Sequence, residues 1–383
     1  MQTEVATMKG PRVAILHNIP VHYQHLLFSA LARKDLNFEV LFGAPSFGNL
    51  AIESPGPEFR TGPYRFRIGA ETEYQNVPPL RMAWFVWSAL SEIRPDIVVV
   101  SGWCDIAAWT AMTWRLVNRR PAVLWAESNE WDHRRVFWKE AIKKFLLRGF
   151  CAAHVYGQSS RDYLVKLGFE SKKIWLKRAV ADIDLFSPGE QPATDSPGKI
   201  VVLYVGRFAA EKNIDIVLDT IPELTPSASE KLLFRFVGCG PLEDRLRRKA
   251  AALGIEGSVE FAGSRKHREL ADVYRSSDVL ILPSLSEPWG LVVNEAMLCG
   301  LPVIASNRCG CARDLIEPRT GWVFPPGDRA ALRKLLEEVA GLPRGALKTK
   351  GRNAYNLARQ YSAENCAEIV LRSLSEVYRG MGG

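Results

Sequence analysis

The sequence has 383 residues, of which 47% are hydrophobic and 24% charged, with a formal net charge of +8. This length exceeds what one hydrophobic core usually serves, so we expect two domains. The composition excludes a disordered, collagen-like or fibrous chain. Neither a signal peptide nor an apolar run of the roughly 18 residues that cross a bilayer is expected.

Cysteine usage indicates a reducing compartment. The seven cysteines are scattered, and only Cys309 and Cys311 lie close together, with a single glycine between them. No second pair completes a zinc site, so we expect reduced thiols in a cytoplasmic protein.

Short runs rich in Val, Ile and Leu alternate with helix-length segments along the whole chain. Such runs are typical of parallel strands that are buried on both faces. Strands that alternate with helices predict doubly wound α/β sheets. The expected strands are 12–16, 38–42, 96–101, 122–126 and 152–156, then 200–206, 232–238, 258–263, 278–283 and 302–306.

The first half contains a basic, aromatic segment. Between His133 and Arg178 there are twelve Lys or Arg and three Asp or Glu, a local charge of +9 that leaves about −1 for the rest. In 134–150, apolar residues recur at helical spacing and cations occupy other faces: Val136, Phe137, Ile142, Phe145 and Leu146, with Lys139, Lys143, Lys144 and Arg148. This helix would rest on an anionic membrane, bind an acidic acceptor, or pack with a solvated basic face. Nucleic-acid binding fits less well, because the basic segment contains no sequence motif known to recognise nucleic acids.

A linker divides the chain. Residues 187–199, SPGEQPATDSPGK, are rich in Pro, Gly and Ser. We therefore expect two Rossmann-like domains facing a cleft, at 1–186 and 200–362. A last helix in 363–383 would pack back on the first domain.

Cations and glycines follow the strands of the second half, where open α/β sheets bind ligands. Arg207 and Lys212 could grip two phosphates, or be solvated surface cations. Gly238 and Gly240 allow close backbone approach of a ligand, or only a strand-to-helix turn. Arg265 could lie near a base, or be another surface arginine.

The stretch SLSEPWGLVVNEAM, from 284 to 297, holds two acids around a predicted helix start at Pro288. The free amides of Gly290 and Leu291 would form a site for a diphosphate. Glu295, in the second turn, could accept hydrogen bonds from ribose hydroxyls, and Glu287 from those of a second sugar. Alternatively, both are surface acids that the helix dipole favours.

Together these motifs resemble the donor domain of family 4 of the retaining glycosyltransferases, which have the GT-B fold. The matching segments are GRFAAEKN (206–213), VGCGPLEDRL (237–246), VEFAG (259–263), 274–306 and GWVFPPGD (321–328). The resemblance implies that Arg207 and Lys212 contact the diphosphate of a nucleotide-sugar, Glu295 the ribose and Glu287 the sugar. It also implies that the anomeric configuration is retained.

The resemblance also bears on metals. The sequence DID at Asp182–Asp184 spells the metal-binding DxD of another glycosyltransferase fold, but its surroundings match the family's hinge segment. Members of the family need no metal for catalysis, so we expect neither a metal nor a cofactor.

The first half departs from the family pattern. No glycine-rich turn follows the first strand, and His22 and His25 would lie near the acceptor or simply on a helix. Where the family often has a functional histidine, this chain reads ESNEWDH. Glu127 could serve as the proton partner of the acceptor or cap a helix, and Ser128 and His133 lie close to the same place.

We therefore predict a glycosyltransferase that moves a sugar from a nucleoside-diphosphate sugar to an acceptor hydroxyl. The acceptor could be a glycan, a lipid-linked sugar or a small molecule, and the enzyme could sit peripherally on an anionic membrane through 134–150. A nucleotide-sugar epimerase and a non-catalytic binding protein are the alternatives.

Overall fold

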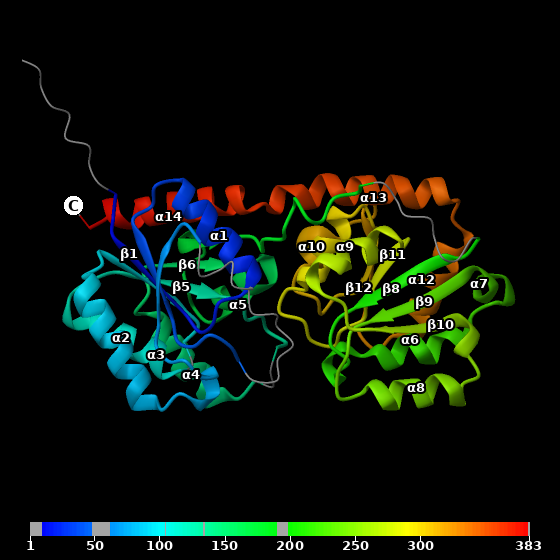
Figure 1. The fold of residues 1–383 in the computed structure, drawn as a ribbon, viewed down its shortest axis with the longest axis horizontal. Helices are drawn as coiled ribbons and strands as arrows, with labels where there is room; N and C mark the ends of the chain where they lie inside the picture. Colours follow the sequence, from blue (N-terminus) through cyan, green and yellow to red (C-terminus); the bar gives the residue numbers. More distant parts are fainter. Residues whose placement is uncertain (1–9, 48–61, 104, 133–134, 190–197, 382–383) are drawn as a thin grey trace, which may run out of the picture.

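The computed structural model describes residues 10–47, 62–103, 105–132, 135–189 and 198–381. It contains two parallel sheets, each covered by helices on both faces (Figure 1). This confirms the predicted α/β class with two Rossmann-like domains.

The sheet of the first domain has seven parallel strands in the order β3-β2-β1-β4-β5-β6-β7. Val13 pairs with Phe38 on one side and with Ile97 on the other, so β1 is an inner strand between β2 and β4. The strands are β1 (Val13–His17), β2 (Phe38–Phe42), β3 (Arg65–Ile68), β4 (Ile97–Ser101), β5 (Ala122–Ala126), β6 (Ala152–Val155) and β7 (Ile174–Leu176).

Different helices cover the two faces of this sheet. One apolar core joins the sheet to α2 (Pro79–Ile93), α3 (Ile106–Val117), α4 (Phe137–Leu147) and α5 (Gln158–Lys166). The core of the opposite face joins it to α1 (His22–Arg33) and α14 (Ala363–Arg379). The 3₁₀ turns are η2 (Tyr74–Asn76) and η3 (Ser171–Lys173).

The sheet of the second domain has six parallel strands in the order β10-β9-β8-β11-β12-β13. They are β8 (Ile200–Val205), β9 (Leu232–Val237), β10 (Val259–Gly263), β11 (Val279–Leu282), β12 (Val303–Ser306) and β13 (Gly321–Phe324). The α-helices are α6 (Ile214–Thr220), α7 (Pro226–Lys231), α8 (Glu243–Ala252), α9 (His267–Arg275), α10 (Leu291–Leu298), α11 (Ala312–Leu315), α12 (Arg329–Gly341) and α13 (Arg344–Ala358). The 3₁₀ turns are η4 (Ala210–Lys212), η5 (Ile221–Glu223), η6 (Glu256–Ser258) and η7 (Arg359–Tyr361).

The chain passes between the domains twice. Of the linker predicted at 187–199, residues 190–197 lie outside the described residues. After η7, α14 returns to the first domain and runs along α1 (Figure 1), where Arg33 pairs with Glu364 at 2.7 Å and Lys34 with Glu368 at 2.9 Å. The last helix is thus part of the first domain's core.

The carboxyl ends of the two sheets face one another. Asn129, after β5, donates to the carbonyl oxygen of Glu287, after β11. The backbone N–H of Gln158, after β6, donates to the carboxylate of Asp314 at 3.1 Å. Segments that follow strands, where ligands of such sheets bind, are therefore in direct contact across the domain boundary.

Candidate functional site

The candidate donor site lies at the point where the strand order of the second sheet reverses. β8 and β11 are neighbours, but the chain continues from β8 toward β9 on one side and from β11 toward β12 on the other. The segments that follow these two strands diverge at such a point and leave a natural ligand position. They carry Arg207 and Lys212 after β8, and Glu287 and Gly290 after β11.

Helix α10 begins later than the sequence predicts. Pro288 lies in the loop, and Gly290 is the N-cap, with φ of +95° in the left-handed region. Glycine adopts this conformation without the steric cost of a Cβ. The prediction that Pro288 starts the helix was therefore wrong, because Trp289 and Gly290 first turn the chain. The N-terminus of α10 opens at Leu291, and its first amides remain suited to an anion.

Glu287 and Lys212 form an ion pair in this structure. The Nζ of Lys212 donates to Oε2 of Glu287, and the two side chains are only 20% and 12% exposed. The sequence assigned them to different parts of a ligand and did not predict that they meet. A lysine ammonium has three N–H donors, so it can hold the carboxylate and a phosphate oxygen together.

The backbone around Glu287 is fixed by two neighbouring segments. Its N–H donates to the carbonyl of Arg308 at 3.2 Å, and its carbonyl accepts from Gly310 N–H at 3.0 Å. The N–H of Leu285 donates to the carbonyl of Glu211 at 2.8 Å. The carboxylate is thus presented by a rigid loop, as a substrate-positioning group requires.

Asn129 extends this support from the first domain, and sequence reasoning missed it. Its amide is fully buried and donates to the carbonyls of Glu287 and Pro288, both at 3.2 Å. It lies within the ESNEWDH segment, so its position after a strand was the only signal that could have singled it out.

Glu295 is buried in the second turn of α10, with 6% exposure, and accepts a hydrogen bond from the hydroxyl of Tyr274 at 2.8 Å. Burial raises the pKa of its carboxyl to about 7, although the Tyr274 hydrogen bond and the charge of His22 act in the opposite direction. A strongly shifted carboxyl beside a helix N-terminus is typical of a functional site.

The structure gives less support to the other predicted donor residues. Arg207 and Arg265 are exposed, and Arg265 donates to the carbonyl of Ser264 at 3.3 Å. Gly238 has φ of +140°, and a Cβ there would lie 2.0 Å from the carbonyl oxygen of Gly206. The neighbouring backbone therefore requires glycine at 238 whether or not a ligand approaches. Gly240 shares this tight packing.

The predicted acceptor-side residues are only partly brought together. Glu127 is exposed and interacts with the hydroxyl of Tyr156, and Ser128 is half-buried beside it. His25 faces away toward Tyr64, with 3.1 Å between its Nδ1 and the tyrosine oxygen. His22 contacts Asp182 and the second domain instead. His133 lies outside the described residues.

A buried lysine near Glu127 was not predicted. Lys177, at 3% exposure, lies between the rings of Trp125 and Tyr156, with its Nζ 3.9 and 4.6 Å from their centroids. Burial lowers its pKa, while the charge of Glu127 raises it. The sequence shows only one more cation in a basic segment, so nothing distinguished it.

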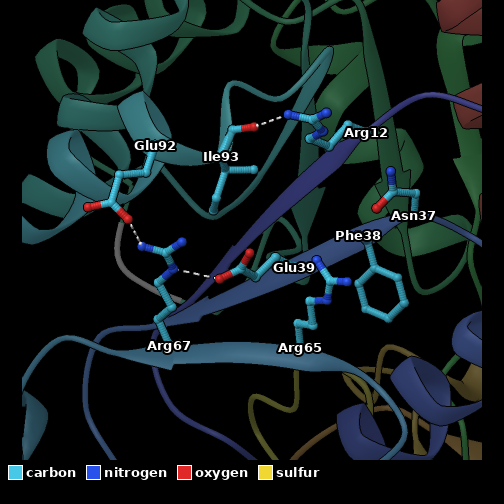
Figure 2. A pocket seen from close by; sticks show the side chains of 8 residues that line it. All are labelled: Arg12, Asn37, Phe38, Glu39, Arg65, Arg67, Glu92 and Ile93. Carbon is cyan, nitrogen blue, oxygen red and sulfur yellow. Dashed lines mark hydrogen bonds and ion pairs between the residues drawn. The ribbon is translucent and has the colours of Figure 1, made fainter.

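A separate cavity of about 420 Å³ lies in the first domain, away from the carboxyl ends of the strands (Figure 2). Its lining comes from the residue before β1, the start of β2, the strand β3 and the end of α2: Arg12, Asn37, Phe38, Glu39, Arg65, Arg67, Glu92 and Ile93. Arg67 is already paired there with Glu39 and Glu92, both at 2.5 Å. This position, away from the carboxyl ends of the strands, excludes it as the donor site.

Comparison with known proteins agrees with this fold. Residues 190–356 match the family model of glycosyl transferases group 1. D-inositol 3-phosphate glycosyltransferase 2 of Catenulispora acidiphila is 34% identical over 219 residues, which cover 51% of this chain and 50% of that protein. The chain thus spans about half the length of this curated relative.

Two solved structures match nearly the whole chain. Anabaena Alr3699/HepE in complex with UDP and glucose has a TM-score of 0.74 at 19% identity, covering 96% of this chain and 100% of that one. The lipopolysaccharide outer core galactosyltransferase WaaB has a TM-score of 0.72 at 17% identity, covering 94% and 98%.

The two facing Rossmann-like domains define the class as GT-B. The second domain carries the residues that match the family model of the glycosyl transferases group 1.

Proposed function

We propose that this protein transfers a sugar from a nucleoside-diphosphate sugar to an acceptor hydroxyl. The observation that carries the proposal is the gathering of Lys212, Glu287, Glu295 and the N-terminus of α10 at the strand-order reversal of a group 1 domain. The acids are buried and bonded rather than solvated, which argues against two incidental surface carboxylates.

The proposed chemistry assigns one part of the donor to each group. The first amides of α10, with Lys212 and Arg207, would take up the negative charge that develops on the leaving diphosphate. Glu295 would accept hydrogen bonds from the ribose and Glu287 from the transferred sugar. These protein groups supply the charge stabilisation, so the proposed transfer needs neither a metal nor a cofactor.

The acceptor would approach from the first domain. Glu127 lies beside Tyr156 and Lys177 at the carboxyl edge of that sheet and is the group we assign to the acceptor's proton. The transition state would resemble an oxocarbenium ion, as in other glycosyl chemistry. Retention of configuration is carried by the family resemblance alone.

The surface of the first domain favours an acceptor at a lipid bilayer. The described residues include sixteen exposed large hydrophobic side chains, and ten lie on three helices: Leu80, Trp84 and Trp87 on α2, Trp109, Leu116 and Val117 on α3, and Phe137, Trp138, Ile142 and Phe145 on α4. The three helices cover the same face of the sheet and are neighbours in Figure 1. Exposed apolar groups concentrated in this way mark an interaction surface.

The charge of this surface favours an anionic membrane. In α4 only Leu147 is buried, while Phe137 is 89% and Phe145 70% exposed. Phe137, Ile142 and Phe145 therefore do not pack against the core, whereas Leu146 and Leu147 do. Exposed Lys139 and Lys144 lie among these aromatics, a combination that binds headgroups and the acyl boundary together. Among the described residues, no helix is both long and apolar enough to cross a bilayer.

The donor proposal is tested by thermal unfolding with UDP, GDP, ADP, TDP and their sugars, with and without a chelator. A ligand that binds only the folded protein raises the midpoint. We expect a shift with one nucleotide that the chelator does not remove. Release of nucleoside diphosphate with an acceptor present, but not with donor alone, separates a transferase from an epimerase. No shift with any nucleotide would contradict the proposal.

The membrane proposal is tested by flotation with vesicles of phosphatidylcholine, with and without phosphatidylglycerol. We expect binding to the anionic vesicles, reduced about tenfold by each of Trp84→Ser, Phe137→Ser and Phe145→Ser, because each loses about 1.5 kcal/mol of apolar burial. Lys139→Glu with Lys144→Glu should remove the preference for anionic lipid.

Leu253→Ser is the matched control, because Leu253 is exposed outside this surface. Equal flotation of all variants would contradict the membrane assignment. The surface would instead bind a second copy of the chain if the native protein bound no vesicles but self-associated in sedimentation. Phe137→Ser should then abolish this self-association.

A further inference from the structure

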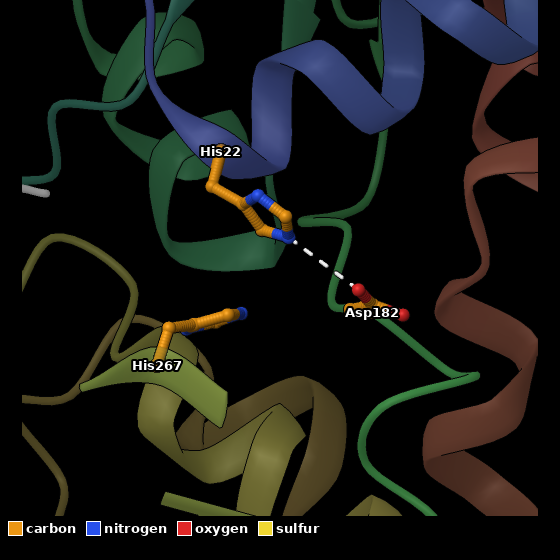
Figure 3. Close-up of side chains that lie close together, drawn as sticks. All are labelled: His22, Asp182 and His267. Carbon is orange, nitrogen blue, oxygen red and sulfur yellow. Dashed lines mark hydrogen bonds and ion pairs between the residues drawn. The ribbon is translucent and has the colours of Figure 1, made fainter. Parts of the chain in front are cut away.

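Three side chains from separate parts of the chain meet at the boundary between the domains. His22 is the first residue of α1, Asp182 lies in the segment that leaves the first domain, and His267 is the first residue of α9 (Figure 3). One ring nitrogen of each histidine and one carboxylate oxygen all lie within 4.8 Å of one another. The function proposed above gives these three side chains no joint role.

The surrounding contacts direct these side chains toward one another. Oδ1 of Asp182 accepts from the N–H groups of Asp184 and Leu185, at 3.1 and 3.0 Å, while Oδ2 lies 3.4 Å from Nε2 of His22. One oxygen of Asp182 is thus held by the backbone, and the other is directed toward His22.

His267 is held in place by an aromatic neighbour. Its ring meets that of Phe186 edge-on, with 5.1 Å between centroids, and Phe186 in turn packs against Tyr274 at 5.7 Å. The rings of His22 and His267 are 4.6 Å apart. The two imidazoles therefore approach each other from opposite domains.

We propose that His22, Asp182 and His267 bind one divalent transition-metal cation between the domains. Two imidazoles and a carboxylate suit zinc, cobalt or nickel, whereas magnesium and calcium prefer all-oxygen sites. Ligand atoms about 2.0–2.1 Å from a tetrahedral zinc lie roughly 3.4 Å apart, which the His22–Asp182 separation of 3.4 Å already meets. The His267 ring nitrogen lies within 4.8 Å of the other two ligand atoms, and it would move closer on metal binding to give three ligands and a fourth position for water.

This site differs from a DxD motif and from the donor chemistry. Asp184 is exposed and contributes its backbone N–H to Asp182, so its carboxylate is not part of the set. The bound cation would link α1, the connecting segment and α9, and would stabilise the contact between the domains. The charge of His22 also acts on Glu295, so the cation would lie near the donor site. Metal binding and nucleotide binding are measured separately, so failure of one proposal leaves the other standing.

The test is titration of tag-free protein with Co²⁺ and Zn²⁺, followed by calorimetry and by the visible absorption of four-coordinate Co²⁺. Cys239→Ser is the background, because this exposed thiol could bind metal by itself. We expect one ion per chain, a higher unfolding midpoint with metal, and affinity lowered at least about tenfold by His22→Ala and by His267→Ala.

Asp184→Asn and His25→Ala are matched controls and should bind as the background protein does. His25 shares α1 with His22 but faces Tyr64, and Asp184 neighbours the proposed ligand. Absence of binding, equal binding by His267→Ala, or Mg²⁺ that competes as well as Zn²⁺ would each overturn the site.

Discussion

Replacement of Glu295 by alanine is expected to lower the affinity for the nucleotide-sugar about 10- to 100-fold, while the protein stays folded. The carboxylate would accept hydrogen bonds from two ribose hydroxyls, and hydrogen bonds to a charged group contribute about 1.5–3 kcal/mol. The side chain lies in α10 and accepts a hydrogen bond from the Tyr274 hydroxyl. Isothermal titration with the nucleotide found in the thermal screen, and with its sugar, measures the loss.

The same carboxyl should make donor binding depend on pH. Its pKa is raised by burial to about 7, so it is mostly protonated at pH 6 and mostly ionised at pH 8. Because the ionised form is the better acceptor, the affinity should rise with pH across this range. The nucleotide-sugar is the right probe, since the terminal phosphate of a free nucleotide itself titrates near pH 6.

Two variants isolate this effect. Glu295→Gln should bind weakly and show no pH dependence in this range, because the titrating group is gone. Glu376→Gln removes an exposed acid from α14, the helix that packs on the first domain. This variant should bind the donor as the native protein does. Unchanged donor affinity in Glu295→Ala would disprove the assignment of this residue to the ribose.

The buried strands could be predicted from the sequence because continuous apolar runs are typical of parallel strands that are covered by helices on both faces. The strand AVLWA, at 122–126, coincides with β5, and the helix expected from residue 363 is α14. The strands β3, β7 and β13 were not among the predicted ones. They lie at sheet edges, where RFRI at β3 alternates charge with apolar residues, IWL at β7 is short, and GWVF at β13 opens on glycine.

The candidate site was predictable to the extent that it depends on residues after strands. The segment that holds Glu287 and Glu295 was found because it follows a clear strand and precedes a clear helix. Contacts between distant segments were not found, since spacing along one chain carries no information on them. The ion pair of Lys212 with Glu287, the support from Asn129 and the burial of Lys177 all depend on such contacts.

Replacement of Glu287 by glutamine is expected to lower the turnover of sugar transfer about 100- to 1,000-fold, with little change in the affinity for the free nucleoside diphosphate. Hydrogen bonds that strengthen as charge develops in the transition state have effects of this size on the rate. Glutamine keeps an oxygen that can accept from the Lys212 ammonium, whereas alanine would leave that ammonium, with 20% exposure, without its carboxylate. Steady-state turnover and nucleotide titration on the same preparation separate the two quantities.

Glu211→Gln is the matched control, because Glu211 is an exposed acid in the neighbouring loop whose backbone carbonyl, not its carboxylate, holds Leu285. It should retain native turnover. If Glu287→Gln weakened binding of the nucleoside diphosphate as much as it slowed transfer, Glu287 would hold the nucleotide rather than the sugar. The division of the two acids between ribose and sugar would then fail, although the donor site itself would remain. A native turnover in Glu287→Gln would mean that the ion pair with Lys212 only shapes the loop.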